Sequence, residues 1–237
     1  RRLTGTIAAL TKRGVAAEKV REIFQYGKDI ESIYFARRAL MTRRQMFLLG
    51  FSQTEINDTL ERNNGVVKNL DESIKADSIA MVSAMESIFY LGNMLLRDSD
   101  AFGMAHGLEI RVPYLDTFTA TAVLSLPGAI RLPSGRANKY LLRKAFAEIC
   151  PPHVLEGKKK GFILPMGVWM KTVLREQCEA GISCLKKTSL VDNHGVDVIW
   201  KDFLSASIHQ DWARPLALCV LGLYLEKTAG SERVANF

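Results

Sequence analysis

The chain has 237 residues and a formal net charge of +7. Hydrophobic residues make up 48% and charged residues 24%, which is typical of globular proteins and excludes a disordered chain. The uncharged run at 215–225 has eleven residues, whereas a membrane-spanning helix needs about 20. We therefore expect a cytoplasmic protein that neither spans nor binds a membrane. No initiator Met and no signal peptide begin the chain, so we also expect a piece of a longer protein.

The basic balance allows an anionic partner, such as a phosphate-bearing substrate or a nucleic acid. The positive residues are scattered, however, and most are expected on solvated helix faces. The cysteines show no C-x-x-C spacing, and no histidine stands at metal-ligand distance along the chain. They predict reduced, metal-free thiols, which are Cys150, Cys178, Cys184 and Cys219.

The first part of the chain has helical periodicity. Apolar residues recur every three or four positions over 16–26 and 29–49, and Gly50 ends the second pattern as a helix C-cap would. Ser52 and Glu55 have the spacing of a capping box. They predict a helix that runs to about residue 62 and stops at Asn63-Asn64-Gly65.

The next predicted helix, 79–96, is apolar on nearly all sides. Asp77 or Ser78 is placed to cap it. A helix without a polar face is normally buried, so we expect this one in the core.

The pattern changes after residue 97. Asp98 and Asp100 have the chemistry of turn residues. Residues 107–113 then alternate strictly between apolar and charged side chains, which predicts an extended segment with Glu109 and Arg111 on one face. Pro113 supports this interpretation because it disfavours a helical conformation at the preceding residue. Asp116 is placed as the N-cap of a helix over 117–125.

Helical patterns return in the last part of the chain. They cover 137–149, 166–179, 195–206 and 212–227, and a loop rich in lysine and glycine covers 156–165. Prolines at 151 and 152 end the first of these helices. The periodicity alone predicts a mainly α protein with one extended charged segment.

Three segments together resemble the synthetase domain of the glutamine-dependent asparagine synthetases. The first runs from Asp100 through Met104-Ala105 and Leu108-Glu109-x-Arg111-x-Pro113-x-Leu115-Asp116. The second is Lys-Tyr-Leu-Leu-Arg at 139–143, and the third is Lys-x-Gly-Phe at 159–162. The order and the approximate spacing are those of the family, although Gly103 stands where the family usually has Ser.

The resemblance covers roughly residues 80–227, leaves 1–75 as an unassigned helical part, and implies that 1–237 is the C-terminal portion of a synthetase domain. Such a domain has an α/β fold like that of the adenine nucleotide alpha hydrolases, and this chain would supply its helical part. The whole enzyme would use ATP and Mg²⁺ to activate aspartate. Ammonia released from glutamine would then displace AMP.

Two parts of that enzyme are not found in the sequence. The family's phosphate loop, Ser-Gly-Gly-x-Asp-Ser, needs adjacent glycines, and none of the 17 glycines here are adjacent. No leading Cys marks a glutaminase domain. We therefore expect the glutaminase and phosphate-loop segments as partners, expect this chain alone to be inactive, and leave a homodimer open.

The resemblance assigns the catalytic role to Lys159, as a cation that neutralises charge developing on the α-phosphate and the tetrahedral centre. Lys158 or Lys160 could occupy the catalytic position instead of Lys159. Glu109 and Arg111 are equally compatible with the acyl-acceptor pocket and with a structural ion pair that anchors the segment to the helices. We interpret His106 as a packed side chain rather than a base.

Lys139 and Arg143 lie four residues apart and are expected on one helix face, where they are solvated or bind phosphate. Two other functions remain open at this stage. One is an amide ligase that acts on another carboxylate, such as a sugar acid, a peptide or a β-amino acid. The other is a helical binding module with a basic face, whose binding to nucleic acid would depend on salt.

Overall fold

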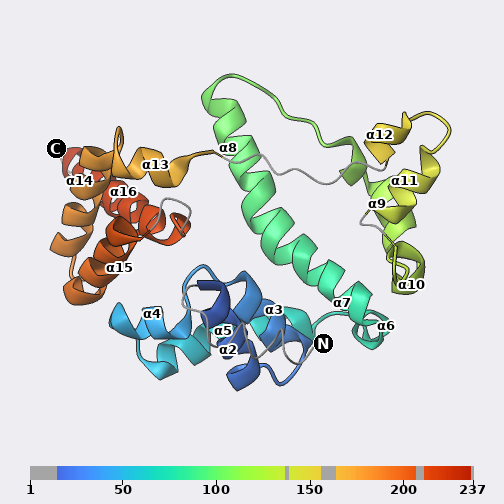
Figure 1. The fold of residues 1–237 in the computed structure, drawn as a ribbon, viewed down its shortest axis with the longest axis horizontal. Helices are drawn as coiled ribbons and strands as arrows, with labels where there is room; N and C mark the ends of the chain where they lie inside the picture. Colours follow the sequence, from blue (N-terminus) through green and yellow to red (C-terminus); the bar gives the residue numbers. More distant parts are fainter. Residues whose placement is uncertain (1–14, 137–138, 156–163, 207–210, 236–237) are drawn as a thin grey trace. The chain divides into compact units, whose positions relative to one another are not determined.

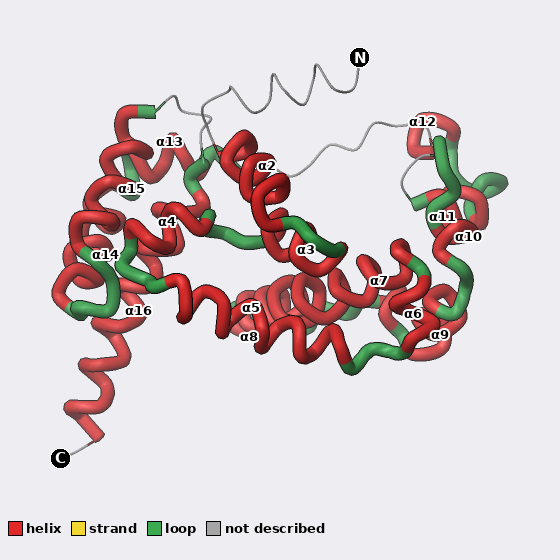
Figure 2. Tube along the Cα trace, turned by 90° about the horizontal axis from the view of Figure 1, so that it is seen from below, coloured by secondary structure: helices red, strands yellow, loops and turns green. Residues whose placement is uncertain are grey.

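The structure is a computed structural model, and it describes residues 15–136, 139–155, 164–206 and 211–235. Every regular element in these ranges is a helix, and no strand occurs among them (Figures 1 and 2). The mainly α prediction is therefore confirmed. The chain forms two units: unit 1 contains 1–64 and 162–237, and unit 2 contains 65–161.

Unit 1 is built from both ends of the sequence. Its helices are α2 (Val15–Tyr26), α3 (Ile30–Arg38), α4 (Arg43–Leu48), α5 (Gln53–Lys68), α13 (Met166–Lys171), α14 (Arg175–Lys187), α15 (Asn193–Ser205) and α16 (Ala213–Ala235), of which α5 continues into unit 2. The capping box of Ser52 and Glu55 is confirmed: the Glu55 N–H donates to Ser52 Oγ at 3.2 Å, and the Ser52 N–H donates to Glu55 Oε2 at 2.8 Å.

Two predicted boundaries between residues 29 and 68 are wrong, and the helix predicted over 166–179 is also broken, because α13 ends at Lys171 and α14 starts at Arg175. The continuous helix expected over 29–49 is broken, because Thr42 and Gln45 form a capping box that starts α4 anew. The helix that was expected to stop at Asn63-Asn64-Gly65 runs on to Lys68. A single helical glycine costs only about 1 kcal/mol, which the surrounding turns can offset.

The core of unit 1 lies where α14, α15 and α16 meet. Its most enclosed side chains come from these helices and from the elements beside them: Leu49, Met170, Cys178, Ile182, Leu185, Val196, Ile199, Trp200, Phe203, Leu218 and Cys219. Gly181 and Gly222 allow the two backbones to touch, since a methyl group on Gly222 would overlap the Gly181 carbonyl. The close crossing of α14 and α16 therefore depends on both glycines.

Unit 2 is dominated by one long helix. Its elements are α6 (Glu72–Ala76), α7 (Ser78–Met85), η1 (Glu86–Leu96, wound as a π-helix), α8 (Arg97–Ala105), η2 (Pro113–Leu115), α9 (Thr117–Leu124), α10 (Gly128–Arg131), α11 (Tyr140–Ala145) and α12 (Pro152–Leu155). From α7 to α8 the chain is helical without a break over 28 residues (Figure 1).

Asp77, one of the two predicted caps, fixes the start of this long helix. Its carboxylate accepts from the N–H groups of Ile79 at 2.9 Å and Ala80 at 3.1 Å. It also accepts from the N–H of Gly128 at 2.6 Å, 51 residues away. One carboxylate thus caps α7 and holds α10 against it, and these hydrogen bonds lower the pKa of Asp77.

The expectation that the helix over 79–96 is buried is wrong in this structure. Only Met81 and Met85 in that stretch are buried. The helix also continues past Asp98 and Asp100, which lie in the first turn of α8 rather than in a turn between elements. Asp98 and Asp100 lie inside one continuous helix, where an aspartate costs less than about 1 kcal/mol relative to alanine, so these residues do not force a break.

The helix from Ser78 to Ala105 is long and apolar enough to cross a membrane, and 11% of its most apolar window is buried. It is the only such helix in the part of the chain that the structure describes. One helix is weak evidence for a membrane protein. Glu86 lies within it, and an acidic side chain inside the bilayer is costly.

Gly222→Ala is expected to lower the free energy of unfolding by about 1–3 kcal/mol, because the added methyl overpacks the contact with Gly181. Chemical denaturation measures this. The three tryptophans, whose fluorescence reports the transition, all lie in unit 1 (Trp169, Trp200 and Trp212). Gly65→Ala is the control: nothing lies within 4 Å of its new methyl group, so it must not lower stability.

Asp77→Asn is expected to lower the free energy of unfolding at neutral pH, by removing a contribution that the wild type itself loses in acid. The folded-state pKa lies below the ordinary value near 3.8, so the carboxylate stabilises the fold fully above that value. The contribution is lost as pH falls through the folded-state pKa. Urea denaturation followed by circular dichroism from pH 7 to pH 3 should show wild type and variant converging in acid. A constant difference would contradict this assignment.

Candidate functional site

The residues of the family motif occupy the exit from α8 in unit 2. The Leu108 N–H donates to the Gly103 carbonyl at 2.9 Å, and the Gly107 N–H donates to the Met104 carbonyl at 3.0 Å. Gly107 adopts φ 67°. This pair of bonds is a Schellman motif, which ends the helix and turns the chain into an extended run.

The extended segment predicted over 107–113 is shorter at both ends, because Gly107 lies in the turn and Pro113 begins η2; residues 108–112 between them form no helix or strand. Glu109 and Arg111 share one face, where Arg111 Nε and Glu109 Oε1 form an ion pair at 3.0 Å. Their side chains are 71% and 84% exposed respectively, so the pair contributes little to stability. It joins two residues of one segment, and it therefore does not anchor that segment to the helices.

His106 is exposed at the end of α8, so the prediction of a packed histidine is wrong. Asp116 is confirmed as the cap of α9, because its carboxylate accepts from the Phe118 N–H at 3.0 Å and the Thr119 N–H at 3.3 Å.

The second motif segment begins with an unusual backbone. Lys139 adopts φ 61°, in the left-handed region, and precedes α11 without a side-chain cap. The Arg143 N–H donates to the Lys139 carbonyl at 2.9 Å. Lys139 thus stands at the N-terminal boundary of a shorter helix than predicted, rather than inside it. A non-glycine residue in this region is strained, and such strain concentrates at functional sites.

Lys159, together with Lys158 and Lys160, lies outside the described residues. Its assignment as the catalytic lysine stays a prediction. The described residues contain no group of three or more His, Cys, Asp or Glu side chains that could hold a metal ion.

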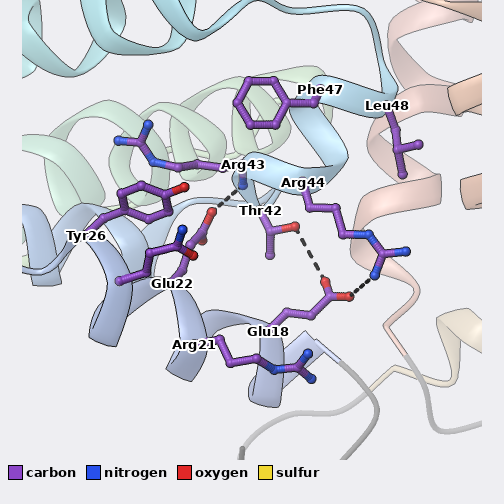
Figure 3. Close-up of a pocket in the computed structure, with 10 residues that line it drawn as sticks. Glu18, Arg21, Glu22, Tyr26, Thr42, Arg43, Arg44, Phe47 and Leu48 are labelled. Atoms are coloured by element: carbon purple, nitrogen blue, oxygen red, sulfur yellow. Dashed lines mark hydrogen bonds and ion pairs between the residues drawn. The ribbon is translucent and has the colours of Figure 1, made fainter.

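Unit 1 contains a charged pocket of about 460 Å³ between α2 and α4 (Figure 3). The residues that line it are Glu18, Arg21, Glu22, Gln25, Tyr26, Thr42, Arg43, Arg44, Phe47 and Leu48. Glu22 accepts from the backbone N–H of Arg43 at the start of α4. The Arg43 guanidinium lies over the Tyr26 ring, 4.4 Å from its centroid.

Glu18 accepts from Thr42 Oγ1 at 3.5 Å and from Arg44 Nη1 at 3.4 Å. The acidic groups of α2 are therefore engaged in holding the first turn of α4. Because Glu18 and Glu22 already bind groups of the protein itself, we interpret the pocket as a polar junction between two helices rather than as a ligand site.

A buried cation lies next to this junction. Arg214 is 2% exposed, donates from Nε to the Leu40 carbonyl at 2.7 Å, and pairs with Asp211 Oδ2 at 2.9 Å. Its Nη1 lies 4.0 Å from Glu18 Oε2. Burial lowers the pKa of Arg214 and raises the pKa of Asp211, while their mutual attraction opposes both shifts.

Sequence reasoning missed this cluster. It assigned no role to residues 1–75, to Asp211 or to Arg214. The contact between Leu40 and Arg214 spans 174 residues, and local spacing carries no signal over that distance. The acidic pair Glu18 and Glu22, one helical turn apart on α2, is the one local feature that could have suggested it.

Comparison with known proteins places the motifs in a family. The asparagine synthase family model matches residues 10–227. The chain is similar to asparagine synthetase [glutamine-hydrolyzing] 1 of Bacillus subtilis, with 41% identity over 85 residues, which is 36% of this chain and 13% of the relative. It is also similar to a putative asparagine synthetase [glutamine-hydrolyzing] of Mycobacterium bovis, with 32% identity over 122 residues (51% and 19%).

An asparagine synthetase [glutamine-hydrolyzing] of Gallus gallus is 39% identical over 85 residues, covering 34% of this chain and 15% of the relative. No solved structure matches the chain. The matches thus span less than a fifth of each of these curated relatives. Because the family match extends over most of its length, the chain belongs to the asparagine synthase family.

Proposed function

We propose that this chain is the helical part of the synthetase domain of an asparagine synthetase, whose parent fold is α/β and whose reaction forms asparagine from aspartate. The observation that supports the proposal is the ordered set of motifs at 100–116, 139–143 and 159–162 inside a family match over 10–227. The names of the relatives support glutamine as the source of ammonia. We place the protein in the cytoplasm.

The chemistry proceeds in two displacements. A β-carboxylate oxygen of aspartate attacks the α-phosphorus of ATP, which enters with Mg²⁺, and pyrophosphate leaves. Ammonia then attacks the acyl carbon of the aspartyl adenylate, loses a proton, and AMP leaves with the oxygen that came from aspartate. Negative charge develops on the tetrahedral centre and on the phosphate, where a fixed cation gives the greatest stabilisation.

Lys159 is proposed as that cation, and Glu109 and Arg111 as contacts of the amino acid. The exposed side chains of the latter two are available to a ligand, since their mutual ion pair is solvated. Arg111 could meet a substrate carboxylate, and Glu109 a substrate ammonium. A charge pair of this kind suits an amino acid, which carries both groups.

The whole enzyme is tested with aspartate labelled by ¹⁸O in the β-carboxylate. Transfer of one ¹⁸O to AMP supports an acyl adenylate, and label retained only in asparagine would contradict it. Parallel assays with glutamate, a sugar acid and a β-amino acid test the substrate. Faster AMP formation with one of these than with aspartate would identify a ligase for another carboxylate.

The 237-residue chain alone is expected not to release pyrophosphate from ATP with aspartate and ammonia. It has no adjacent glycines to form the phosphate loop that would hold the leaving group. A coupled pyrophosphate assay against a blank without protein measures this. Turnover above that blank would show that the described helices hold the nucleotide without such a loop.

Lys159→Ala in the whole enzyme is expected to slow asparagine formation by about 10²–10³-fold, since removal of one preorganised donor has that effect. Glutamate release from glutamine should continue, because that reaction belongs to another domain. Lys159→Arg should not restore the rate, since a planar guanidinium cannot replace a compact ammonium.

Lys158→Ala and Lys160→Ala are the matched controls. Near wild-type asparagine formation by Lys159→Ala, with loss in one neighbour, would move the catalytic role to that neighbour. Normal rates in all three variants would remove the lysine loop from the mechanism.

A further inference from the structure

Gly103, near the end of α8, is covered by the segment that follows the helix. It is buried, whereas Phe102 and Met104 on either side of it are 71% and 60% exposed. A methyl group built on Gly103 would lie 2.8 Å from the Leu108 carbonyl oxygen. It would also lie 3.1 Å from Ile110 Cδ1 and 3.3 Å from Ile110 Cγ1. A side chain of any size at this position therefore requires its neighbours to shift.

The Schellman turn explains why the segment comes so close. The Gly103 carbonyl accepts from the N–H groups of His106 at 3.0 Å and Leu108 at 2.9 Å, so the chain folds back over the glycine. In such motifs an apolar side chain at this helical position commonly contacts a residue just after the turn. Here the helix offers no side chain, and Ile110 packs against the bare backbone instead.

Space rather than backbone conformation demands the glycine. The backbone of Gly103 is helical and has a negative φ, unlike that of Gly107. Any residue adopts that conformation, and a glycine inside a helix costs about 0.5–1 kcal/mol relative to alanine. The chain keeps this cost at a position where the approach of the Leu108 carbonyl leaves no room for a Cβ atom.

The close approach also fixes the residues beside Ile110. Glu109 and Arg111 share one face of the segment, as their ion pair at 3.0 Å shows, and Ile110 between them packs on the glycine. Because the Leu108 oxygen belongs to the main chain, it cannot make room by changing a rotamer. A side chain on residue 103 therefore displaces the main chain of the segment, and Glu109 and Arg111 move with it.

We propose that Gly103 is a positioning residue, which sets where Glu109 and Arg111 stand for binding the amino acid substrate. This inference rests on the proposed function of those two side chains. Two charged contacts hold an amino acid in one orientation only if both are correctly placed, and a misplacement of about 1 Å can cost about 10²-fold in rate. The glycine acts on the substrate through the segment and does not touch it.

The contacts behind this inference are local. All of them lie between residues 103 and 110, so they do not depend on segments that lie outside this chain. The family usually has Ser at position 103, so the close seating of the segment is a feature of this chain rather than a general one. In the proposed function, ATP is held by the phosphate loop and ammonia is released in another domain. A displaced segment should therefore weaken binding of the amino acid selectively.

Two substitutions of increasing size in the whole enzyme test the inference. The KM for aspartate should rise by about tenfold in Gly103→Ala and by more in Gly103→Val, while the KM for ATP and the release of glutamate from glutamine stay as in wild type. Gly65→Ala and Gly65→Val are the matched controls, because nothing lies within 4 Å of a methyl group on that helical glycine. An unchanged KM for aspartate in Gly103→Val would overturn the proposal, as would an equal rise in the KM for ATP. Circular dichroism verifies folding, and Gly103→Ala carries the test if the larger change does not fold.

Amide exchange in the 237-residue chain gives a measurement that is independent of the reaction. The Leu108 N–H donates to the Gly103 carbonyl, so displacement of the segment should open this bond and speed the exchange of that amide in Gly103→Ala. The Ala80 N–H, which Asp77 holds at the other end of the long helix, should exchange as in wild type. Unchanged exchange at Leu108 would overturn the positioning role.

The two measurements separate this inference from the proposed function. If the whole enzyme forms no AMP with aspartate, the proposed substrate is wrong, and the KM comparison is made with the carboxylate that does support AMP formation. If aspartate is the substrate, and exchange at Leu108 rises while the KM for aspartate stays at the wild-type value, the proposed function stands and Gly103 has no role in it.

Discussion

Arg214 carries a positive charge at a position that is 2% exposed, so it requires hydrogen-bond acceptors and counter-charges inside the protein. Several segments of unit 1 supply them. Its partners come from three places in the sequence: Glu18 on α2, the Leu40 carbonyl before α4, and Asp211 before α16. Removing a charge from water is costly, and losing one partner of a buried pair typically costs about 3–5 kcal/mol. Helices α2 and α16 are thus held to one group.

The same cation shapes its neighbours. The pKa of Lys19 is lowered by burial and then by Arg214, and its ammonium donates to the Arg37 carbonyl at 2.8 Å. Glu18 divides its oxygens between Thr42, Arg44 and Arg214. The polar junction of α2 and α4 is therefore an extension of the buried pair. Between α14 and α16 the contact is apolar instead, and burial there raises the pKa of the Cys178 and Cys219 thiols.

Features decided within one helical turn could be predicted from the sequence. The caps at Ser52, Asp77 and Asp116 depend on spacings of two or three residues, and all three are confirmed. The shared face of Glu109 and Arg111 follows from the period of an extended chain, and the ion pair agrees with it. Cys178, Cys184 and Cys219 are buried, as free hydrophobic thiols commonly are, and their reduced, metal-free state stays a prediction.

Features that depend on distant partners could not be predicted. The helix over 79–96 looks like a core helix by composition, but burial depends on what packs against it. The Asp77–Gly128 bond and the Leu40–Arg214 bond cross 51 and 174 residues, which no periodicity encodes. In the candidate site, the motif gave the identities of Glu109 and Arg111. Their exposure depends on what packs against the segment that follows the Schellman turn at Gly107, and the alternating pattern does not contain that information.

The discontinuity of unit 1 has a consequence for the order in which the protein folds. Unit 2 is continuous, so its residues can meet as soon as they leave the ribosome. Residues before 65 must wait for the segment after 161. At synthesis rates of about 5–20 residues per second, Arg214 follows Leu40 by about 10–35 s. During that interval the acidic side chains of α2 lack their buried counter-charge. The helices before residue 65 therefore cannot complete their packing until the segment after residue 161 has been synthesised.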